Sequence, residues 1–176
     1  YTNTEGSYNV ASGYHALRGN TEGDHNIASG YQALYANTLG SRNIAIGYRS
    51  LFINTEGIDN IAIGYYALRY NTLGTYNVAS GRESLFANTT GANNTAIGRR
   101  SLYSNTTGGQ NIAIGFQSGR YIANGSTANQ TSGTSVYIGG YTKALADGGA
   151  NEIVIGYNAI GNGSNTVTLG NTSVTK

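Results

Sequence analysis

Apolar residues occur along this chain in short alternating runs and not in long stretches. In "NTLGSRNIAIG" (37–47), two isoleucines flank an alanine, so alternate side chains point to opposite faces, as in a β-strand. Nearly the same eleven residues stand seventeen positions earlier, at 20–30, and seventeen later, at 54–64. The Asn-Thr-x-Gly that opens each copy has the residue types of a tight turn. The pattern predicts one short strand bounded by turns in every unit of seventeen residues.

This unit occurs seven times between residues 3 and 121, as N-T-x-G-x-x-N-[IV]-A-[IS]-G-x-x-[AS]-L-x-x. Only Thr95, at the Ile/Val position, and Gly119, at the Leu position, depart from it. Seventeen residues are too few for a helical repeat or a propeller blade, but they suit one coil of a parallel β-solenoid. Stacked copies would align equal side chains, so we expect a hydrogen-bonded amide ladder that needs no ligand. Its members are Asn9, Asn26, Asn43, Asn60, Asn77, Asn94 and Asn111.

Each coil has few apolar residues to bury, so a solenoid this thin is expected to be marginal alone and to need copies packed beside it. We expect the Ile/Val and Leu ladders inside the coil. The small Ala ladder would then face a neighbouring chain, although the opposite assignment remains open. The segment after the strand, such as 31–37, is expected to form a second strand or an irregular edge with a single tight turn.

The regular spacing stops after Tyr121. Residues 123–134 are small and polar and are expected to form a loop. Altered strand motifs then return in "SVYIGG", "NEIVIGY" and "NTVTLGN". The chain is therefore expected to comprise a seven-coil solenoid (1–122), a polar loop (123–134) and altered C-terminal coils (135–176).

Composition excludes several classes of protein. Charged residues make up 10% of the chain and the formal net charge is +2, which is too weak and too evenly spread for binding nucleic acid. No apolar run approaches the roughly 18 residues of a membrane span, so no membrane insertion is expected. The chain has no cysteine, and thus neither disulfides nor thiolate metal sites.

Catalytic residues are not grouped in the sequence. The two histidines, His15 and His25, occupy different variable positions, and acidic residues such as Asp59 are scattered. A catalytic triad or carboxylate pair needs convergent groups in a pocket. Neither a nucleophile elbow nor a phosphate-binding loop is found. We therefore expect no enzymatic activity, no cofactor and no metal site.

The motifs "NIAIGY" and "NEIVIGYNAIGNGSNTVTLG", with the N-T-x-G turns, resemble the head repeats of trimeric autotransporter adhesins and similar repeats in bacteriophage tail fibres. The resemblance covers nearly the whole chain. It implies a left-handed β-roll, a homotrimer, and attachment to a host cell or surface glycan from a virion tail fibre or a bacterial surface. The ending "NTVTLGNTSVTK" resembles the stretch that precedes the intramolecular chaperone domain of many phage fibres.

Positions that vary between coils are the candidates for recognition, because invariant positions serve the stack. A stripe of aromatic and Arg residues is either a ladder that stabilises the fibre or a surface on which sugars stack and form hydrogen bonds. The break in the repeat is a second candidate, since loops on a rigid scaffold commonly carry function. The candidate receptor- or glycan-binding residues are Tyr14, Tyr31, Tyr48, Tyr65, Arg82, Arg99 and Phe116 in the stripe, and Tyr141 and Lys143 at the break.

The alternative function is a Thr-ladder surface-binding solenoid, such as an ice-binding protein. Thr follows the first Asn of every regular coil. Because the position two residues further on is Gly, however, this single rank would make a poor flat face. The Thr rank consists of Thr4, Thr21, Thr38, Thr55, Thr72, Thr89 and Thr106.

Overall fold

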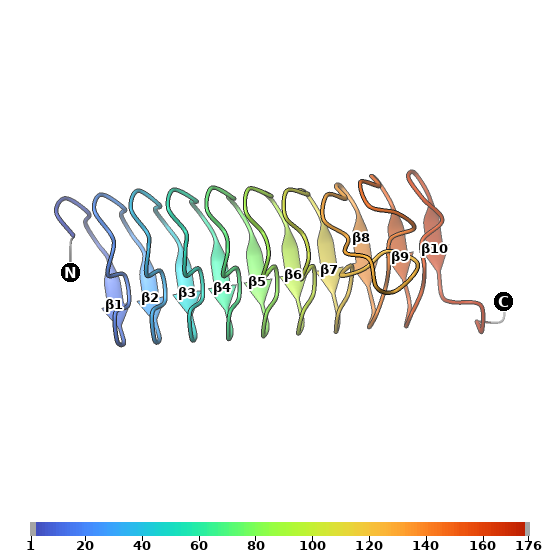
Figure 1. The fold of residues 1–176 in the computed structure, drawn as a ribbon, viewed down its shortest axis with the longest axis horizontal. Helices are drawn as coiled ribbons and strands as arrows, with labels where there is room; N and C mark the ends of the chain where they lie inside the picture. Colours follow the sequence, from blue (N-terminus) through green and yellow to red (C-terminus); the bar gives the residue numbers. More distant parts are fainter. Residues whose placement is uncertain (1–2, 175–176) are drawn as a thin grey trace.

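The structure is a computed structural model that describes residues 3–174. Figure 1 shows short strands lying side by side in chain order, with the two ends of the chain at opposite ends of the stack. All of them belong to one ten-stranded parallel sheet, so the chain is an all-β parallel β-solenoid of about nine coils of about 17 residues. The strands are β1 (Val10–Ser12), β2 (Ile27–Ser29), β3 (Ile44–Ile46), β4 (Ile61–Ile63), β5 (Val78–Ser80), β6 (Thr95–Ile97), β7 (Ile112–Ile114), β8 (Val136–Ile138), β9 (Ile153–Ile155) and β10 (Val167–Leu169).

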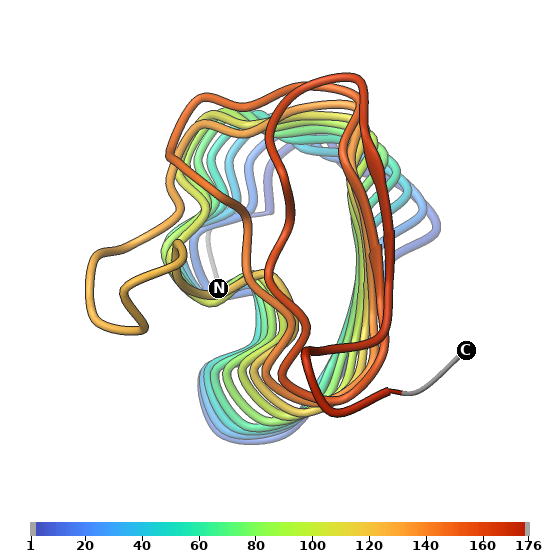
Figure 2. The same cartoon turned by 90° about the vertical axis from the view of Figure 1, so that its right-hand side faces the viewer.

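The sequence period sets the register of the sheet. Each strand residue pairs with the equivalent residue of the next coil, as Ala45 does with Ala62. The N-T-x-G corners stack in the same register: the backbone N–H groups of Thr38, Leu39 and Gly40 all donate to the Thr55 carbonyl, at 3.0–3.1 Å. Seen end-on in Figure 2, the regular coils have the same outline, each displaced slightly from the one before. The predicted β-solenoid is confirmed.

The first Asn of each repeat forms an amide ladder inside the N-T-x-G corner. Asn54 donates from Nδ2 to Oδ1 of Asn37 in the preceding coil (2.8 Å) and to the Gly57 carbonyl of its own turn (2.9 Å). One side chain therefore closes the turn and also joins two coils. The equivalent bonds recur in neighbouring coils with nearly the same lengths.

The second Asn, immediately before the strand, forms a separate buried ladder. In Asn60, both Nδ2 and the backbone N–H donate to Asn43 Oδ1, at 3.1 and 3.0 Å, and Nδ2 also donates to the Gly74 carbonyl at 2.9 Å. Its own Oδ1 accepts the same pair of bonds from Asn77. These bonds hold each coil in register with the next. They link the seven asparagines expected from the sequence, from Asn9 to Asn111.

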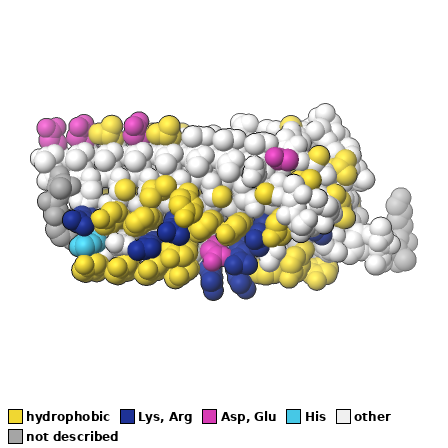
Figure 3. Space-filling view, in the orientation of Figure 1, with side chains coloured by type: hydrophobic (Ala, Val, Ile, Leu, Met, Phe, Trp, Pro, Cys, Tyr) yellow, Lys and Arg dark blue, Asp and Glu magenta, His cyan; other side chains and the backbone are white. Residues whose placement is uncertain are grey.

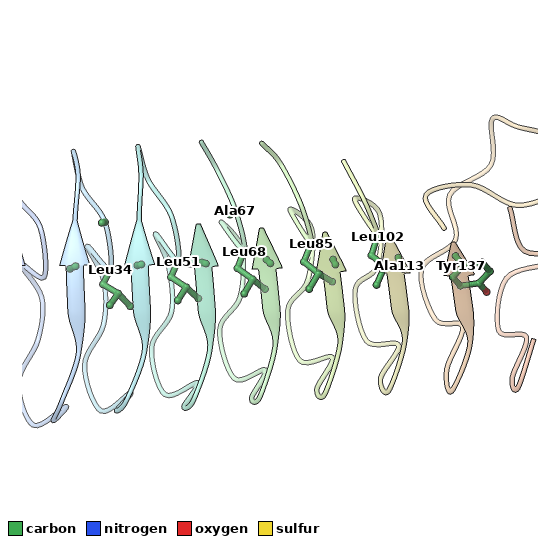
Figure 4. Close-up of a cluster of buried hydrophobic side chains, with 14 of the residues drawn as sticks. Leu34, Leu51, Ala67, Leu68, Leu85, Leu102, Ala113 and Tyr137 are labelled. Carbon is green, nitrogen blue, oxygen red and sulfur yellow. The ribbon is translucent and has the colours of Figure 1, made fainter. Parts of the chain in front are cut away.

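The interior of the coil holds the Ala and Leu ranks. Figure 4 shows the leucines of successive coils pointing the same way toward the strands. In β3, Ala45 is fully buried whereas Ile46 is 41% exposed. The expectation of an inward Ile/Val ladder and an outward Ala ladder is therefore wrong, while the inward Leu ladder is right. In the regular coils the space behind the strand is filled by the buried Leu and Asn ranks together with the Ala methyl groups.

The segment after each strand turns and forms no second strand. Residues 31–36 are consecutive turns, and the same holds in the other regular coils. Leu34 adopts a left-handed backbone, with φ 49°, and so does Gln32, with φ 53°. The expectation of a second strand is wrong and that of a tight turn is right, because left-handed residues curl the chain and prevent it from extending.

Gly47 closes the strand at a place where only glycine fits. Its φ is +127°, and a Cβ built on it would lie 2.6 Å from the Gly64 carbonyl oxygen of the next coil. In stacked coils the backbone of this corner contacts the backbone of the same corner in the next coil. Glycine is therefore required both for its positive φ and because no Cβ would fit.

The interior is repacked where the repeat breaks. Gly119 takes the Leu position, and the ring of Tyr137 fills the space: a Cβ at Gly119 would lie 2.8 Å from Tyr137 Cδ2. Tyr137 itself stands at the Ala position of β8 and is fully buried. Between these residues the chain leaves the stack (Figure 2), with an antiparallel bridge from Tyr121 to Ala128 at the base of the excursion. The segment from 123 to 134 lies here.

Candidate binding site

Three ranks of variable side chains follow the strand across its glycine corner, and together we call them the aromatic–arginine face. Figure 3 shows hydrophobic side chains in rows along the stack with Lys and Arg among them. The first rank is Tyr14, Tyr31, Tyr48, Tyr65, Arg82, Arg99 and Phe116; the second is His15, Gln32, Arg49, Tyr66, Glu83, Arg100 and Gln117; the third is Arg18, Tyr35, Phe52, Arg69, Phe86, Tyr103 and Arg120.

The tyrosines of the first rank stack face to face. Ring centroids are 5.3 Å apart between Tyr14 and Tyr31, 5.0 Å between Tyr31 and Tyr48, and 5.1 Å between Tyr48 and Tyr65, with interplanar angles of 6–17°. The His15 ring, 3.9 Å away, stacks on Tyr14. The faces of the inner rings are therefore occupied by other rings, and what remains for a partner is their edges. A sugar could not stack on these rings as the sequence suggested.

The arginines of the first rank continue the stack with charge. The Arg82 guanidinium lies over the Tyr65 ring at 5.3 Å, and that of Arg99 over Phe116 at 5.4 Å. Both side chains are exposed, and they are one coil apart. Positive charge therefore interrupts the aromatic rank between Tyr65 and Phe116.

Glu83 balances part of this charge from the second rank. Its carboxylate forms an ion pair with Arg100 and a longer one, at 3.4 Å, with Arg82. Burial acts to raise the pKa of the Glu83 carboxyl, but the hydrogen bond and charge of Arg100, supported by Arg82, hold the pKa below its usual value. The carboxylate therefore stays ionised at neutral pH. The cluster is left with a net positive charge.

The third rank packs in the same layered way. The Tyr35 and Phe52 rings stack at 5.2 Å, and Phe86 and Tyr103 at 4.9 Å. The Arg69 guanidinium lies 5.9 Å from the centroids of both Phe52 and Phe86 and thus bridges the two stacks. Layered contacts of this kind stabilise neighbouring coils, which supports a structural role for much of this face.

The two candidates at the break are placed differently. Tyr141 joins the aromatic–arginine face, with its ring edge-on to Phe116 at 5.0 Å. Lys143 is half-buried, and its Nζ donates to Asn158 Oδ1. The structure thus brings Tyr141 together with the stripe, whereas Lys143 is engaged in joining two C-terminal coils.

A shallow hollow of about 280 Å³ opens beside the third rank in the first coils. Its lining includes Arg18 and Tyr35 and the small residues Gly19 and Ala36. In the middle of the stack the equivalent small positions are taken by Ile53 and Tyr70, which are larger. The hollow is a part of this face where a small ring could be partly enclosed.

The Thr rank is engaged with the backbone. Thr38 Oγ1 donates to the Thr55 carbonyl at 3.0 Å, and Thr55 and Thr89 repeat the same bond in their own coils. The hydroxyl hydrogens are therefore used within the stack and do not form a free lattice on a flat surface.

We accordingly expect no thermal hysteresis from the purified chain. A freezing-point assay at millimolar concentration measures this, because ice-binding surfaces need hydroxyls free to meet ice. A clear hysteresis gap that disappears when Thr55 and Thr72 are replaced by bulky Tyr would instead support the ice-binding alternative.

The sequence also placed Tyr137 at the break in the repeat as a candidate for binding, but its side chain is fully buried. Glu152, which is fully buried as well, was not singled out from the sequence. Burial raises the pKa of the Tyr137 phenol, and the charge of Glu152 acts in the same direction. A signal for Glu152 was present, because "NEIVIG" places a glutamate where the regular coils have the ladder Asn.

Comparison with known proteins adds no family to this picture: no protein-family model, no curated protein and no solved structure matches the chain. Within residues 3–174 no helix is long and apolar enough to cross a membrane.

Proposed function

We propose that this chain is a structural and adhesive segment of a homotrimeric fibre, which attaches a virion or a bacterial cell to a host surface. The observation that carries the proposal is the outer face of the sheet. Side chains at the first and third positions of every strand point away from the coil, and most of them are Ile, Val or Leu. The resemblance to trimeric adhesin and tail-fibre repeats supports the same assignment, including the left-handed sense of the coil.

The outer face of the sheet is mainly apolar, with Ser or Thr at an outward position in four of the strands. Ile63 is 42% exposed and Ile97 is 43% exposed, and none of the residues in β1–β10 carries a charge. Parallel sheets normally have both faces covered, and monomeric proteins rarely expose apolar patches larger than a few hundred Å². This face is therefore expected to be buried against another surface.

A second and third copy of the same chain fit this face best. A straight stack needs a partner with the same rise per coil along its whole length, and an identical chain has it by construction. Depletion of charge is typical of the core of a protein interface. Three copies around one axis would cover all the outer faces, whereas the aromatic–arginine face, beyond the glycine corner, would stay accessible.

The attachment role is assigned to the aromatic–arginine face. Because ring faces are occupied within the stack, the groups offered to a partner are tyrosine edges, phenol hydroxyls and the Arg82 and Arg99 guanidinium groups. These groups recur from one coil to the next, so they form a row along the stack. A repetitive glycan could bind weakly at many points and gain affinity through three copies of the face.

Replacing Tyr31, Tyr48 and Tyr65 together by Phe tests this role without disturbing the stack. The rings and their contacts remain, so the unfolding midpoint should stay within about 2 °C, since exposed substitutions alter stability by at most about 0.5 kcal/mol. Attachment to host cells or to a glycan array should fall at least tenfold, because three hydroxyls are lost from each chain, at about 1 kcal/mol apiece.

The companion variant replaces the same tyrosines by Ser, which removes the stack as well. It should lose both thermal stability and attachment. If the Phe variant attaches as well as the unmodified chain, the first rank is structural and this segment is a shaft.

A further inference from the structure

Glu152 joins two irregular corners from inside the C-terminal coils. It is fully buried, and its Oε1 accepts hydrogen bonds from the Gly163 N–H at 2.8 Å and the Leu145 N–H at 3.3 Å. Its Oε2 is equally buried and has no hydrogen-bond partner among residues 3–174. A buried carboxylate oxygen without a partner is costly, so this atom requires an electropositive neighbour.

Three oxygen atoms converge near Gly149. A Cβ built on Gly149 would lie 3.6 Å from the Ala146 carbonyl oxygen and 3.8 Å from both Glu152 Oε2 and Ser132 Oγ. Ala146 and Glu152 lie on one short stretch, in the enlarged corner and immediately before β9, whereas Ser132 comes from the segment that rejoins the stack before β8. The fold therefore brings Ser132 to the other two oxygens.

None of these three oxygens has a hydrogen to offer the others. Ser132 donates its hydroxyl hydrogen to Asn129 Oδ1 at 2.6 Å, and Asn129 is held in that orientation because its Nδ2 donates to the Gly119 carbonyl. Ser132 Oγ therefore presents lone pairs only. The Ala146 oxygen accepts none of the backbone hydrogen bonds in the described chain. These three oxygens are therefore all acceptors.

We propose that Glu152 Oε2, Ser132 Oγ and the Ala146 carbonyl oxygen bind a hard metal cation. Carboxylate, hydroxyl and carbonyl oxygens are the ligands that such cations prefer, and Ca²⁺ in particular accepts mixed sets of them in flexible geometry. The hydroxyl of Tyr137 is fully buried beside Ser132 and Asn129, and no direct hydrogen bond joins it to another described residue. Because burial raises the pKa of this phenol, it keeps its hydrogen and would offer the same cation a lone pair of its oxygen.

The bound cation ties the enlarged corner to the rest of the stack. It joins the backbone carbonyl of Ala146 to the side chain of Ser132, which precedes β8, and to the side chain of Glu152, which precedes β9. These are the coils in which the Asn ladder is replaced by Ser135 and Glu152, so a cation supplies a cross-coil link where the amide ladder ends. The sequence predicted no metal site because it contains only a single carboxylate for this cluster, and its other ligands come from neutral residues.

The test is thermal unfolding of the full chain, first treated with a chelator and then exposed to Ca²⁺, Mg²⁺, Na⁺ or K⁺ at constant ionic strength. With one carboxylate, a dissociation constant on the order of 0.1–1 mM is expected for Ca²⁺. At 10 mM the unfolding midpoint should then rise by roughly 3–10 °C. Glu152→Gln should abolish this rise, because the amide supplies its own N–H to the neighbouring acceptors.

Glu56→Gln is the matched control: it makes the same chemical change at an exposed corner and should keep the full cation response. Ser132→Ala retains the carboxylate and should weaken Ca²⁺ binding measured by calorimetry, which keeps the test informative if Glu152→Gln fails to fold. The proposal is overturned if none of the cations shifts the midpoint, or if Glu152→Gln responds as the unmodified chain does. It is also overturned if acidification alone supplies the stabilisation, since Glu152 would then be neutralised by a proton.

Discussion

Replacing Ile63 and Ile97 together by Asp is expected to convert a stable trimer into monomers. Both side chains lie on the outer face of the sheet, in β4 and β6, and each is about two-fifths exposed in the isolated chain. Burial of that remainder contributes about 2 kcal/mol per isoleucine, or on the order of 10 kcal/mol for the six in a trimer. The aspartates would in addition bring six carboxylates together around one axis without partners.

Size-exclusion chromatography with light scattering measures the change in mass. The control is Leu73→Asp, which places the same charge at a residue that is 49% exposed on the N-T-x-G corner. It should remain trimeric, because that corner lies outside the sheet face. A double variant that keeps the mass of the unmodified assembly would show that the outer face of the sheet is not the interface.

Asn60→Ala is expected to destabilise the stack by about 2–5 kcal/mol. The side chain donates to the Gly74 carbonyl and accepts from the backbone N–H of Asn77, and both of these groups would be left buried without a partner. Each such group costs about 1–3 kcal/mol. In a solenoid the loss is transmitted to neighbours, since each coil contacts only the coils beside it.

Chemical denaturation followed by circular dichroism measures the loss. Asn60→Asp separates the two roles of the amide: it keeps Oδ1 as the acceptor for Asn77 but replaces the donor that faces Gly74 by a second acceptor. It should be at least as destabilising as Ala. Thr90→Ala, at an exposed corner, should change stability by less than about 0.5 kcal/mol. If Asn60→Ala matched Thr90→Ala, the ladder would not be a principal source of stability.

The repeat predicted the architecture because a period of seventeen residues is compatible with few folds other than a β-solenoid. Seventeen residues with one alternating run and one turn motif require a strand in each coil, and stacking in register follows from the invariance of residues such as Asn60 and Gly47. The amide ladders follow from the same invariance. What alternation cannot decide is which face of the strand is inside: Ala45 and Ile46 are equally compatible with either side until the width of the interior is known.

Other features depend on three-dimensional packing that the pattern does not encode. Leucine rarely adopts positive φ, yet Leu34 and its equivalents do so in every regular coil, because the turn has to bring their side chains under the sheet. The compensation between Gly119 and Tyr137 joins residues on different coils. Stacking of the Tyr31 and Tyr48 rings depends on the spacing between coils. Because the stack covers the ring faces, a partner of this surface could contact only the ring edges.

The sequence therefore predicted which variable positions lie together on one face, but not how their side chains pack. Variable positions do form a continuous surface from Tyr14 to Phe116, and Tyr141 extends it. Lys143 is engaged with Asn158, which sequence spacing could not have shown. The proposed cation cluster around Glu152 was missed because its ligands come from two irregular segments, and one of them is a backbone carbonyl.

Sedimentation equilibrium of the unmodified chain over a range of concentrations tests the central claim most directly. The account predicts a folded species with three times the 18.3 kDa mass of the chain, with no folded monomer at the lowest concentration measured. A stable, folded monomer of 18.3 kDa, with the apolar outer face of its sheet in contact with water, would contradict it.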